Sequence, residues 1–287
     1  MKRVNGARLS LLSAMLIFGT IGIFRKYIPL PSGLVAFSRG LIGMLFILLI
    51  MAIRKEKMDW KAIKPNFLFL SVSGMMIGIN WILLFESYRF TTVATATLCY
   101  YMAPLFVMLA APFVLKERIT LKKGICMLVA LVGMVLVSGV LDTGFSGIGE
   151  LKGVLFGLGA AAFYASVILL NKKIHNVSAF SKTAIQLGFA ALIILPYTLI
   201  VENLPQAPTP ATVILLLVVG VVHTGISYAL YFGSMKSLPA QTIVLFSYLD
   251  PIVAILLSVL LLQEPMTLLS GIGAVLILGS TVWSELS

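Results

Sequence analysis

The chain has 287 residues, of which 60% are hydrophobic and only 11% charged, and its mean hydropathy is +1.08. A soluble domain carries about 25% charged residues, so this composition excludes an ordinary soluble protein and indicates an integral membrane protein. The net charge of +11 does not indicate a nucleic-acid partner, because the basic residues gather in short links between apolar runs and no recognition motif accompanies them.

The chain starts with a basic stretch, MKRVNGARLS, ahead of an apolar run. A signal peptide has the same order, but no small-residue cleavage site follows and many more apolar runs come after. We therefore expect a cytoplasmic tail that leads into a retained first helix.

Ten runs are long enough to cross the membrane, since a helix needs about 20 apolar residues to span about 30 Å of hydrocarbon. In chain order they cover 8–27, 32–53, 66–88, 92–114, 120–140, 149–171, 178–200, 210–233, 239–261 and 267–285. Backbone groups in lipid must be paired within their own segment, and the runs are too long for barrel strands. The sequence therefore predicts an all-α polytopic membrane protein with ten transmembrane helices.

The basic residues predict the orientation of these helices, because Lys and Arg concentrate in cytoplasmic links. With the N-terminus inside, 16 of the 21 basic residues face the cytoplasm: Lys2, Arg3, Arg8, Arg54, Lys55, Lys57, Lys61, Lys64, Lys116, Arg118, Lys122, Lys123, Lys172, Lys173, Lys182 and Lys236. We expect a multi-pass protein of the bacterial cytoplasmic membrane with both termini in the cytoplasm.

The second half of the chain repeats the first at an offset of 147 residues. From Gly78 to Gly124, 15 of 47 positions are identical to their counterparts, without a gap. Each copy holds five helices, an odd number, so the second copy enters the membrane from the opposite side. We predict two inverted five-helix repeats, 1–140 and 149–287. Such repeats are typical of secondary transporters, whose sites lie near the midplane between the repeats.

The link after the fourth run, LKERIT, loses all its basic residues in the second copy but keeps its glutamate. Opposite sides of the membrane explain the lost charges. We interpret Glu117 and Glu264 as scaffold residues that hydrogen-bond nearby helix ends or pair with a base. Thr120 and Thr267 are suited to cap the helices that follow.

Four motifs occur in a consistent order: FGTIGIFRKYIP (18–29), AFSRGLIG (36–43), YYMAPLFVML (100–109) before LKERIT, and SYLDPIVAIL (247–256) before LQEPMT. This organisation resembles the drug/metabolite transporter superfamily, specifically the bacterial ten-helix EamA-domain proteins, over essentially the whole chain. The resemblance implies metabolite transport, often export, through a central cavity lined by helices 1, 3, 4, 6, 8 and 9 of the ten. The motifs are not specific for a substrate.

Asp250 is the clearest candidate for a functional charge, because it lies in the middle of the ninth run, where a charge costs about 2.5–3.5 kcal/mol. Pro251 removes a backbone donor beside it and favours a kink. The kink would place free carbonyls next to a carboxylate, as in a cation or ammonium site. The alternative is that Asp250 pairs with a buried base or caps the broken helix. Asp250 aligns with Ala103, so it breaks the symmetry of the repeat.

His223 lies near the centre of the eighth run and shares one helix face with Ser227 and Tyr231. Histidine titrates near neutral pH, so proton coupling is one interpretation. A hydrogen-bonded structural histidine is the other.

Aromatic and polar pairs recur in both copies. Asn80 and Trp81 align with Ser227 and Tyr228, which fits either a pocket lining or interhelical packing. Tyr100, Tyr101 and Tyr248 lie near the matched prolines. The predicted substrate-binding set is Asp250, Asn80, Trp81, Tyr100, Tyr101, His223, Ser227, Tyr228 and Tyr248.

Four charged residues are candidates for gating or ion pairs. Glu86, Arg89 and Lys26 lie near the outer ends of the third and first runs, where they either form a gate or are solvated ends with snorkelling stems. Arg39 lies about two turns inside the second run and needs a partner: Glu86, a carbonyl or an anionic ligand group.

The sequence holds no phosphate loop, paired-histidine metal motif or nucleophile elbow, so we expect no enzyme, cofactor or metal. The favoured function is a secondary transporter that exports small metabolites, such as amino acids or amines, by alternating access. The expected partners are a small-molecule substrate and the lipid bilayer, with coupling to a proton or a counter-substrate, in a monomer or homodimer. The alternatives are an anion or sugar-phosphate exchanger, or a membrane-embedded lipid enzyme.

Overall fold

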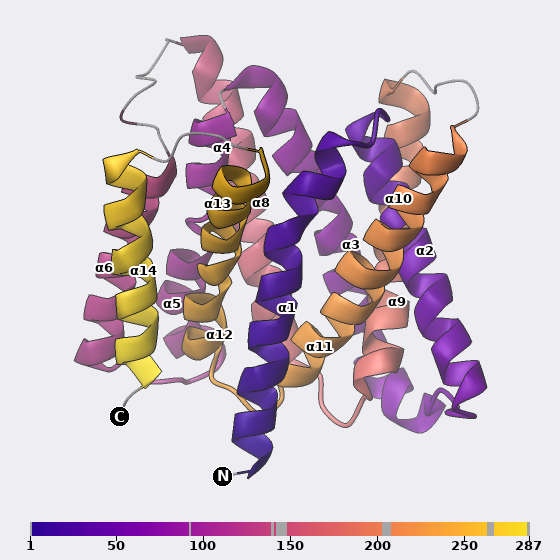
Figure 1. Ribbon diagram of the computed structural model, residues 1–287. Helices are drawn as coiled ribbons and strands as arrows, with labels where there is room; N and C mark the ends of the chain where they lie inside the picture. The colour runs from indigo at the N-terminus through magenta and orange to yellow at the C-terminus, as the bar shows by residue number, and fades with distance from the viewer. Residues whose placement is uncertain are drawn as a thin grey trace.

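Long helices joined by short links run roughly alongside one another in the computed structural model (Figure 1). The structure describes residues 2–91, 93–138, 141, 148–202, 208–262 and 267–285. Within these residues all the regular structure is helical and no strand occurs. An all-helical fold follows from the apolar runs, because a helix pairs its backbone groups within its own segment.

The helices account for every predicted apolar run. In chain order they are α1 (Lys2–Lys26), α2 (Ser32–Ile53), α3 (Trp60–Phe90), α4 (Val93–Tyr100), α5 (Ala103–Val114), α6 (Leu121–Ser138), α8 (Ile148–Lys173), α9 (Ala179–Val201), α10 (Pro210–Gly220), the π-helix η1 (Val221–Ile226), α11 (Ser227–Ser234), α12 (Ala240–Ser247), α13 (Leu249–Leu262) and α14 (Leu268–Glu285). The third run begins earlier than predicted, at Trp60, where the Asp59 side chain accepts hydrogen bonds from the first turn.

Among the described residues, seven helical stretches are long and apolar enough to cross a membrane. They are Val4–Lys26, Ser32–Ile53, Trp60–Phe90, Thr95–Val114, Leu151–Lys173, Ala179–Val201 and Pro210–Ser234. Two further apolar helices, Ala240–Ala254 and Gly271–Trp283, are shorter. The structure is thus that of a multi-pass membrane protein, while the count of ten crossing helices stays a prediction.

Two predicted runs are each broken into two helices at equivalent positions. The run at 92–114 breaks after Tyr100, and the run at 239–261 breaks after Ser247. In each case a proline, Pro104 or Pro251, stands four residues beyond the last residue of the first helix. Proline lacks the N–H that would bond that residue's carbonyl, so the break follows from the sequence.

Helices from the two halves of the chain pack in corresponding pairs. Helix α1 of the first half packs against α11 and α13 of the second half. Its counterpart α8 in the second half packs against α3, α4 and α5 of the first half. Likewise α2 contacts η1, and α3 contacts α9. The remaining major pairs, α2 with α9 and α6 with α14, join equivalent helices. The helices of each half therefore pack largely against helices of the other half.

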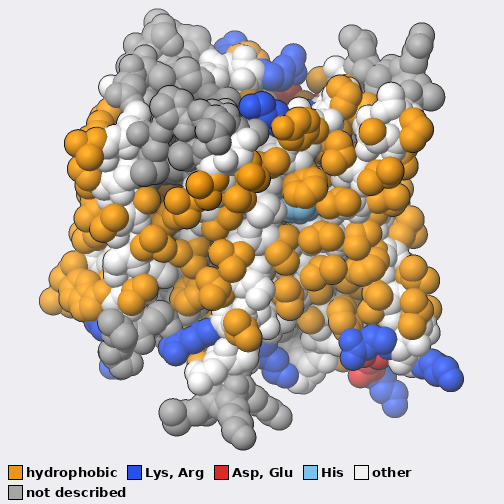
Figure 2. All heavy atoms as spheres, in the orientation of Figure 1, with side chains coloured by type: hydrophobic (Ala, Val, Ile, Leu, Met, Phe, Trp, Pro, Cys, Tyr) orange, Lys and Arg blue, Asp and Glu red, His pale blue; other side chains and the backbone are white. Residues whose placement is uncertain are grey.

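The end at which α1 begins and α14 ends, at the bottom of Figure 1, is called the lower end here. The links at this end are 54–59, 115–120, 174–178 and 235–239. The basic residues predicted to be cytoplasmic lie in these links or in the neighbouring helix turns. Figure 2 shows a wide belt of apolar side chains over the middle of one face, with Lys and Arg at its lower margin and also near the top of the view.

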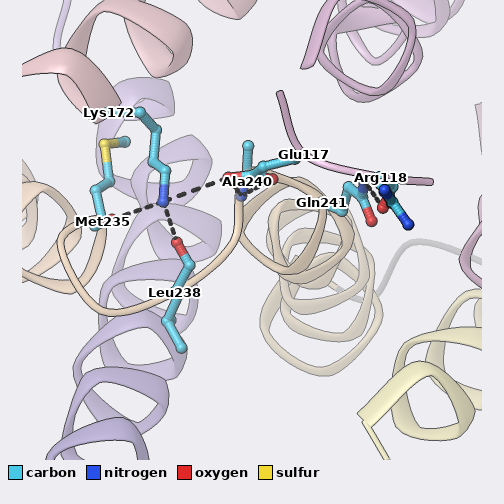
Figure 3. A network of polar contacts seen from close by, with 7 residues as sticks. All are labelled: Glu117, Arg118, Lys172, Met235, Leu238, Ala240 and Gln241. Atoms are coloured by element: carbon cyan, nitrogen blue, oxygen red, sulfur yellow. Dashed lines mark hydrogen bonds and ion pairs between the residues drawn. The ribbon is translucent and has the colours of Figure 1, made fainter. Parts of the chain in front are cut away.

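Glu117 links the lower ends of several helices through hydrogen bonds and an ion pair, as the scaffold interpretation predicts (Figure 3). Its carboxylate accepts from the backbone N–H of Ala240, the first residue of α12, at 3.0 Å, and it pairs with Lys172 of α8 at 3.5 Å. Gln241 donates to the carbonyl of Arg118 at 3.1 Å. Thr120 accepts from the N–H of Lys123 at 3.3 Å, the predicted cap. Glu264 lies outside the described residues.

Candidate functional site

A cavity of about 240 Å³ lies between helices that come from both halves of the chain. Its wall is mostly aromatic and carries two charged side chains, one of each sign. The lining residues are Phe18, Ile21, Arg39, Trp81, Leu84, Phe85, Tyr88, Thr97, Tyr100, Tyr101, Tyr164, Tyr228, Tyr231 and Asp250. We refer to this space as the central cavity.

A packed apolar layer separates the central cavity from the lower end. Buried apolar side chains lie on five segments that lead from the cavity region toward that end: Leu11 and Met15 on α1, Val107 and Met108 on α5, Val167 and Ile168 on α8, Met235 beyond α11, and Ile243 and Val244 on α12. These side chains belong to one hydrophobic cluster. The structure is therefore closed between the central cavity and the lower end.

Asp250 lies in the first turn of α13, directly after the break at Tyr248. Its carboxylate is hydrogen-bonded by the Tyr101 side chain, and it forms no ion pair with any described residue. Gly19 of α1 allows the close approach, because a Cβ there would lie 2.7 Å from the Asp250 carbonyl oxygen. The acid thus faces the cavity with one tyrosine hydroxyl as its partner.

Arg39 supplies the opposite charge from α2. Its guanidinium carbon lies 3.9 Å from the centroid of the Trp81 ring, a distance typical of a cation–π contact. The Tyr228 side chain hydrogen-bonds it, but its Nε is buried without a hydrogen-bond partner. Arg39 forms no ion pair within the described part of the chain. A partly buried guanidinium without an anion is costly.

The aromatic residues of the wall are packed edge to face or stacked. Tyr100 stacks on Tyr164 with ring centroids 5.6 Å apart, and the Tyr164 and Tyr231 hydroxyls lie 2.8 Å apart. Tyr228 contacts Phe18 at 5.2 Å and Trp81 at 6.1 Å. These contacts hold the rings in fixed positions, so the cavity offers planar faces and hydroxyls in a defined arrangement.

The structure brings together six of the predicted residues, namely Asp250, Arg39, Trp81, Tyr100, Tyr101 and Tyr228. Four others point elsewhere. Asn80 donates to the Ala160 carbonyl of α8 at 2.6 Å, and Ser227 donates to the Val222 carbonyl at 2.9 Å. Tyr248 is fully buried, with its hydroxyl 3.1 Å from the Tyr101 carbonyl. His223 Nε2 lies 2.7 Å from the Thr20 hydroxyl, outside the cavity wall.

The end of the bundle opposite the lower end is called the upper end here. The predicted gating residues lie there, apart from Arg39. Glu86 pairs with Arg89 at 2.8 Å and accepts a short hydrogen bond from the Tyr197 hydroxyl. Arg89 and Tyr197 line a small cavity of about 160 Å³, which shares Phe85 with the central cavity. Phe85 therefore stands between the central cavity and the upper end. Lys26 is exposed at the end of α1.

Several wall residues are additions to the predicted set: Phe18, Tyr88, Thr97, Tyr164 and Tyr231. Tyr231 follows Tyr228 by three residues, so both lie on one face of α11. That spacing is a signal that the sequence contains. Tyr164 lies among small residues in GAAAFYAS and has no aromatic counterpart one turn away, so its position depends on the packing of α8.

The central cavity offers groups that can recognise charged and aromatic ligands. Its polar groups are a carboxylate, a guanidinium and tyrosine hydroxyls, a set that can hold an ammonium, an anion and a planar or apolar group. Among the described residues no group of three or more His, Cys, Asp or Glu side chains could hold a metal ion.

Comparison with protein families finds a match over nearly the whole chain. The model of the EamA-like transporter family matches twice, at residues 6–139 and 151–285.

Individual relatives agree with this match. An uncharacterized transporter of Bacillus subtilis, YxxF, is 31% identical over 260 residues, which cover 89% of this chain and 82% of that protein. An uncharacterized transporter of Clostridium kluyveri is 28% identical, covering 84% of this chain and 80% of that protein. A crystal structure that is 21% identical superposes with a TM-score of 0.84 and covers 98% of this chain and 97% of its own, which shows a shared fold.

Proposed function

Because the chain belongs to the EamA-like transporter family, we propose that it is a secondary transporter of the bacterial cytoplasmic membrane that exports small metabolites, amino acids or amines. The observation that carries the proposal is the central cavity, which holds one carboxylate and one guanidinium within aromatic walls. Transport of solutes as such follows from the family, and the charges and rings of the wall support the proposed substrate class.

An amino acid matches both charges of the wall. Its ammonium group would lie against the Asp250 carboxylate, and its carboxylate would lie against Arg39, which has a free donor at Nε. The aromatic rings would take the side chain. An amine would use the Asp250 end alone and leave Arg39 without its counter-ion. Amino acids are therefore the favoured substrates and amines the second choice.

Alternating access would proceed by rocking of two inverted five-helix repeats, 1–140 and 149–287, around the central cavity. The double family match, at 6–139 and 151–285, and the equivalent breaks after Tyr100 and Ser247 support this division. So do the corresponding helix pairs of the two halves. The present state, closed toward the lower end, would be the one that releases substrate at the upper end.

Both termini are proposed to be cytoplasmic, because the lower-end links carry most of the basic residues. Energy would come from a gradient of protons or of a counter-substrate. Asp250 is the candidate proton carrier, since it is the titratable acid in the cavity wall. His223 lies outside the wall, so a direct role for it is disfavoured.

The exchanger of anions or sugar phosphates remains the alternative, and Arg39 is the observation that favours it. A dianionic phosphate is expected to need several cations, as in the Arg and Lys clusters of phosphate sites. The wall supplies a single guanidinium and places a carboxylate in the same space. That carboxylate would repel the substrate, so we rank this function second.

A thermal-shift screen on the purified protein tests the substrate class. The ligands are the amino acids, their decarboxylated amines, and phosphorylated sugars at matched concentration. We expect stabilisation by one or more amino acids and a smaller shift with the corresponding amines. Vesicle flux of the hits then separates transport from binding. Stabilisation by sugar phosphates alone would favour the exchanger and reject the proposed substrate class.

A further inference from the structure

A further cavity, of about 200 Å³, lies at the lower end and shares no wall residue with the central cavity. It is enclosed by the link between α8 and α9, the first turn of α9 and the end of α11. Its wall includes Ser178, Ala179, Lys182, Gly233 and Lys236. We refer to it as the lower-end cavity.

Lys182 is a buried cation in the wall of this cavity. Its side chain is 4% exposed, and it forms no ion pair with any residue that the structure describes. Its ammonium group reaches the Asn171 carbonyl at 3.4 Å, which uses one of three donors. The charges that act on it, Lys172 and Lys236, are both positive. A buried charge surrounded in this way is costly unless an anion joins it.

Lys172 shows how the same end of the bundle accommodates a cation that has its partners (Figure 3). It pairs with Glu117 at 3.5 Å and donates to the carbonyl oxygens of Leu238 at 2.7 Å and Met235 at 3.4 Å. Glu117 is itself held by the Ala240 N–H. The carboxylate of this network is therefore already engaged, and Lys182 gains no counter-ion from it.

The start of α9 adds to the positive potential of the lower-end cavity. Ser178 caps the helix by accepting from the Ser181 N–H at 3.1 Å, and Ser178 and Ala179 both line the cavity. The first turn of a helix directs unpaired N–H groups and the positive end of its dipole outward, which favours anions. Lys236 is exposed and stands at the rim. A buried cation, a rim cation and a helix N-terminus thus face one small space.

We propose that the lower-end cavity binds a phosphate group, held by Lys182, Lys236 and the first turn of α9. The phosphate could be the diester of an anionic lipid headgroup, since basic pockets between helices at the cytoplasmic side bind such headgroups, or it could belong to a soluble phosphate. The site is separate from the transport cavity, and the proposal stands whether or not amino acids are the transported solutes.

Thermal unfolding of the full-length protein in a neutral detergent tests the proposal. One arm adds inorganic phosphate, and the other adds phosphatidylglycerol, with phosphatidylcholine as the lipid control. We expect one arm to raise the unfolding temperature by about 2 °C or more at saturation. Lys182→Met should lose this shift and Lys236→Gln should reduce it. Lys173→Gln, an exposed lysine of the same end outside the cavity wall, should keep it.

The two arms distinguish the source of the phosphate. A shift with phosphatidylglycerol alone assigns a lipid headgroup, and a shift with inorganic phosphate assigns a soluble ligand. Without ligand, Lys182→Met should be at least as stable as the parent, because it removes an uncompensated buried charge. If Lys182→Met fails to fold, Lys236→Gln carries the test. No shift in either arm, or a full shift in the Lys236→Gln protein, overturns the proposal.

Discussion

Asp250 and Arg39 are opposite charges in the wall of one cavity, and neither has an ion-pair partner among the described residues. Each charge in a membrane-spanning segment costs about 2.5–3.5 kcal/mol on insertion scales. The tyrosine partners, Tyr101 for the acid and Tyr228 for the guanidinium, offset part of that cost. A zwitterionic ligand would supply the missing counter-charges, so we propose that the two residues set the substrate class together.

Replacing Arg39 by Gln should separate amino acids from amines. Loss of a charge-assisted hydrogen bond of about 1.5–3 kcal/mol should raise the KM for an amino acid about 10- to 100-fold, while the KM for the decarboxylated amine stays nearly unchanged. Vesicle flux with both substrates measures the difference. Arg54→Gln, which removes an exposed guanidinium paired with Glu56, is the control. An equal loss for amino acid and amine would contradict a carboxylate-binding role.

The sequence predicted some of the residues that line the central cavity but not the others. Depth in an apolar run singled out Asp250, and its proline neighbour indicated the helix break. Asn80 and Trp81 could not be told apart, because adjacent helix residues point about 100° from each other and only packing decides which one faces the cavity. Trp81 lines the cavity, whereas Asn80 bonds α8. Ser227 and Tyr228 divide in the same way.

At the scale of elements, α1 and α13 approach closely beside the cavity because α1 carries Gly19. A Cβ at this position would lie 2.5 Å from the Val253 Cβ and 2.7 Å from the Asp250 carbonyl oxygen. Contacts this short force the helices apart. Gly22, one turn further along α1, has no atom within 4 Å of the same added Cβ. The two glycines therefore form a matched pair.

Gly19→Ala should destabilise the protein by about 1–3 kcal/mol, as overpacking does, and should lower transport because Asp250 moves. Gly22→Ala should be neutral or stabilising by up to about 1 kcal/mol, since alanine is the better helix former. Thermal unfolding in detergent, combined with flux, compares the two variants. Equal unfolding temperatures for both variants would show that the close approach of α1 and α13 contributes little to the stability of the protein.

The breaks in the helices were predictable to different degrees. Pro251 and its counterpart Pro104 lie in matched motifs, and both interrupted helices follow from the missing proline N–H. The π-helix η1 was not predicted, because the segment VVHTGI reads as an ordinary apolar helix. Gly220, directly before η1, packs closely against Ile42 of α2, and α2 contacts η1 itself. Such contacts leave no periodic signal in the sequence.

For the whole molecule, we propose two repeats of opposite orientation. The lower-end links hold most of the basic residues, and the helix pairs of the two halves correspond. Apolar run lengths and the offset of 147 residues indicated the bundle and its division from sequence alone. The closure between the cavity and the lower end could not be indicated, because it depends on how side chains from five segments interlock.

The proposed orientation predicts which side of the membrane each link faces. A cysteine in place of Glu56, at the lower end, should be inaccessible to a membrane-impermeant thiol reagent added to intact cells and should react in inside-out vesicles. A cysteine in place of Tyr27, which is 60% exposed at the upper end, should behave in the opposite way. The native Cys99 and Cys126 are buried, so the parent serves as the blank. Reversed labelling would invert the proposed topology.

The most direct test of the central claim is amino-acid flux in proteoliposomes that contain either the parent or Asp250→Asn. The matched control is Asp59→Asn, which changes a carboxylate at the start of α3, outside the cavity. We expect Asp250→Asn to lower flux at least about tenfold, through loss of a charge-assisted contact, while Asp59→Asn transports like the parent. Unchanged flux in the Asp250→Asn protein, at every pH tested, would contradict the claim that this carboxylate binds the substrate.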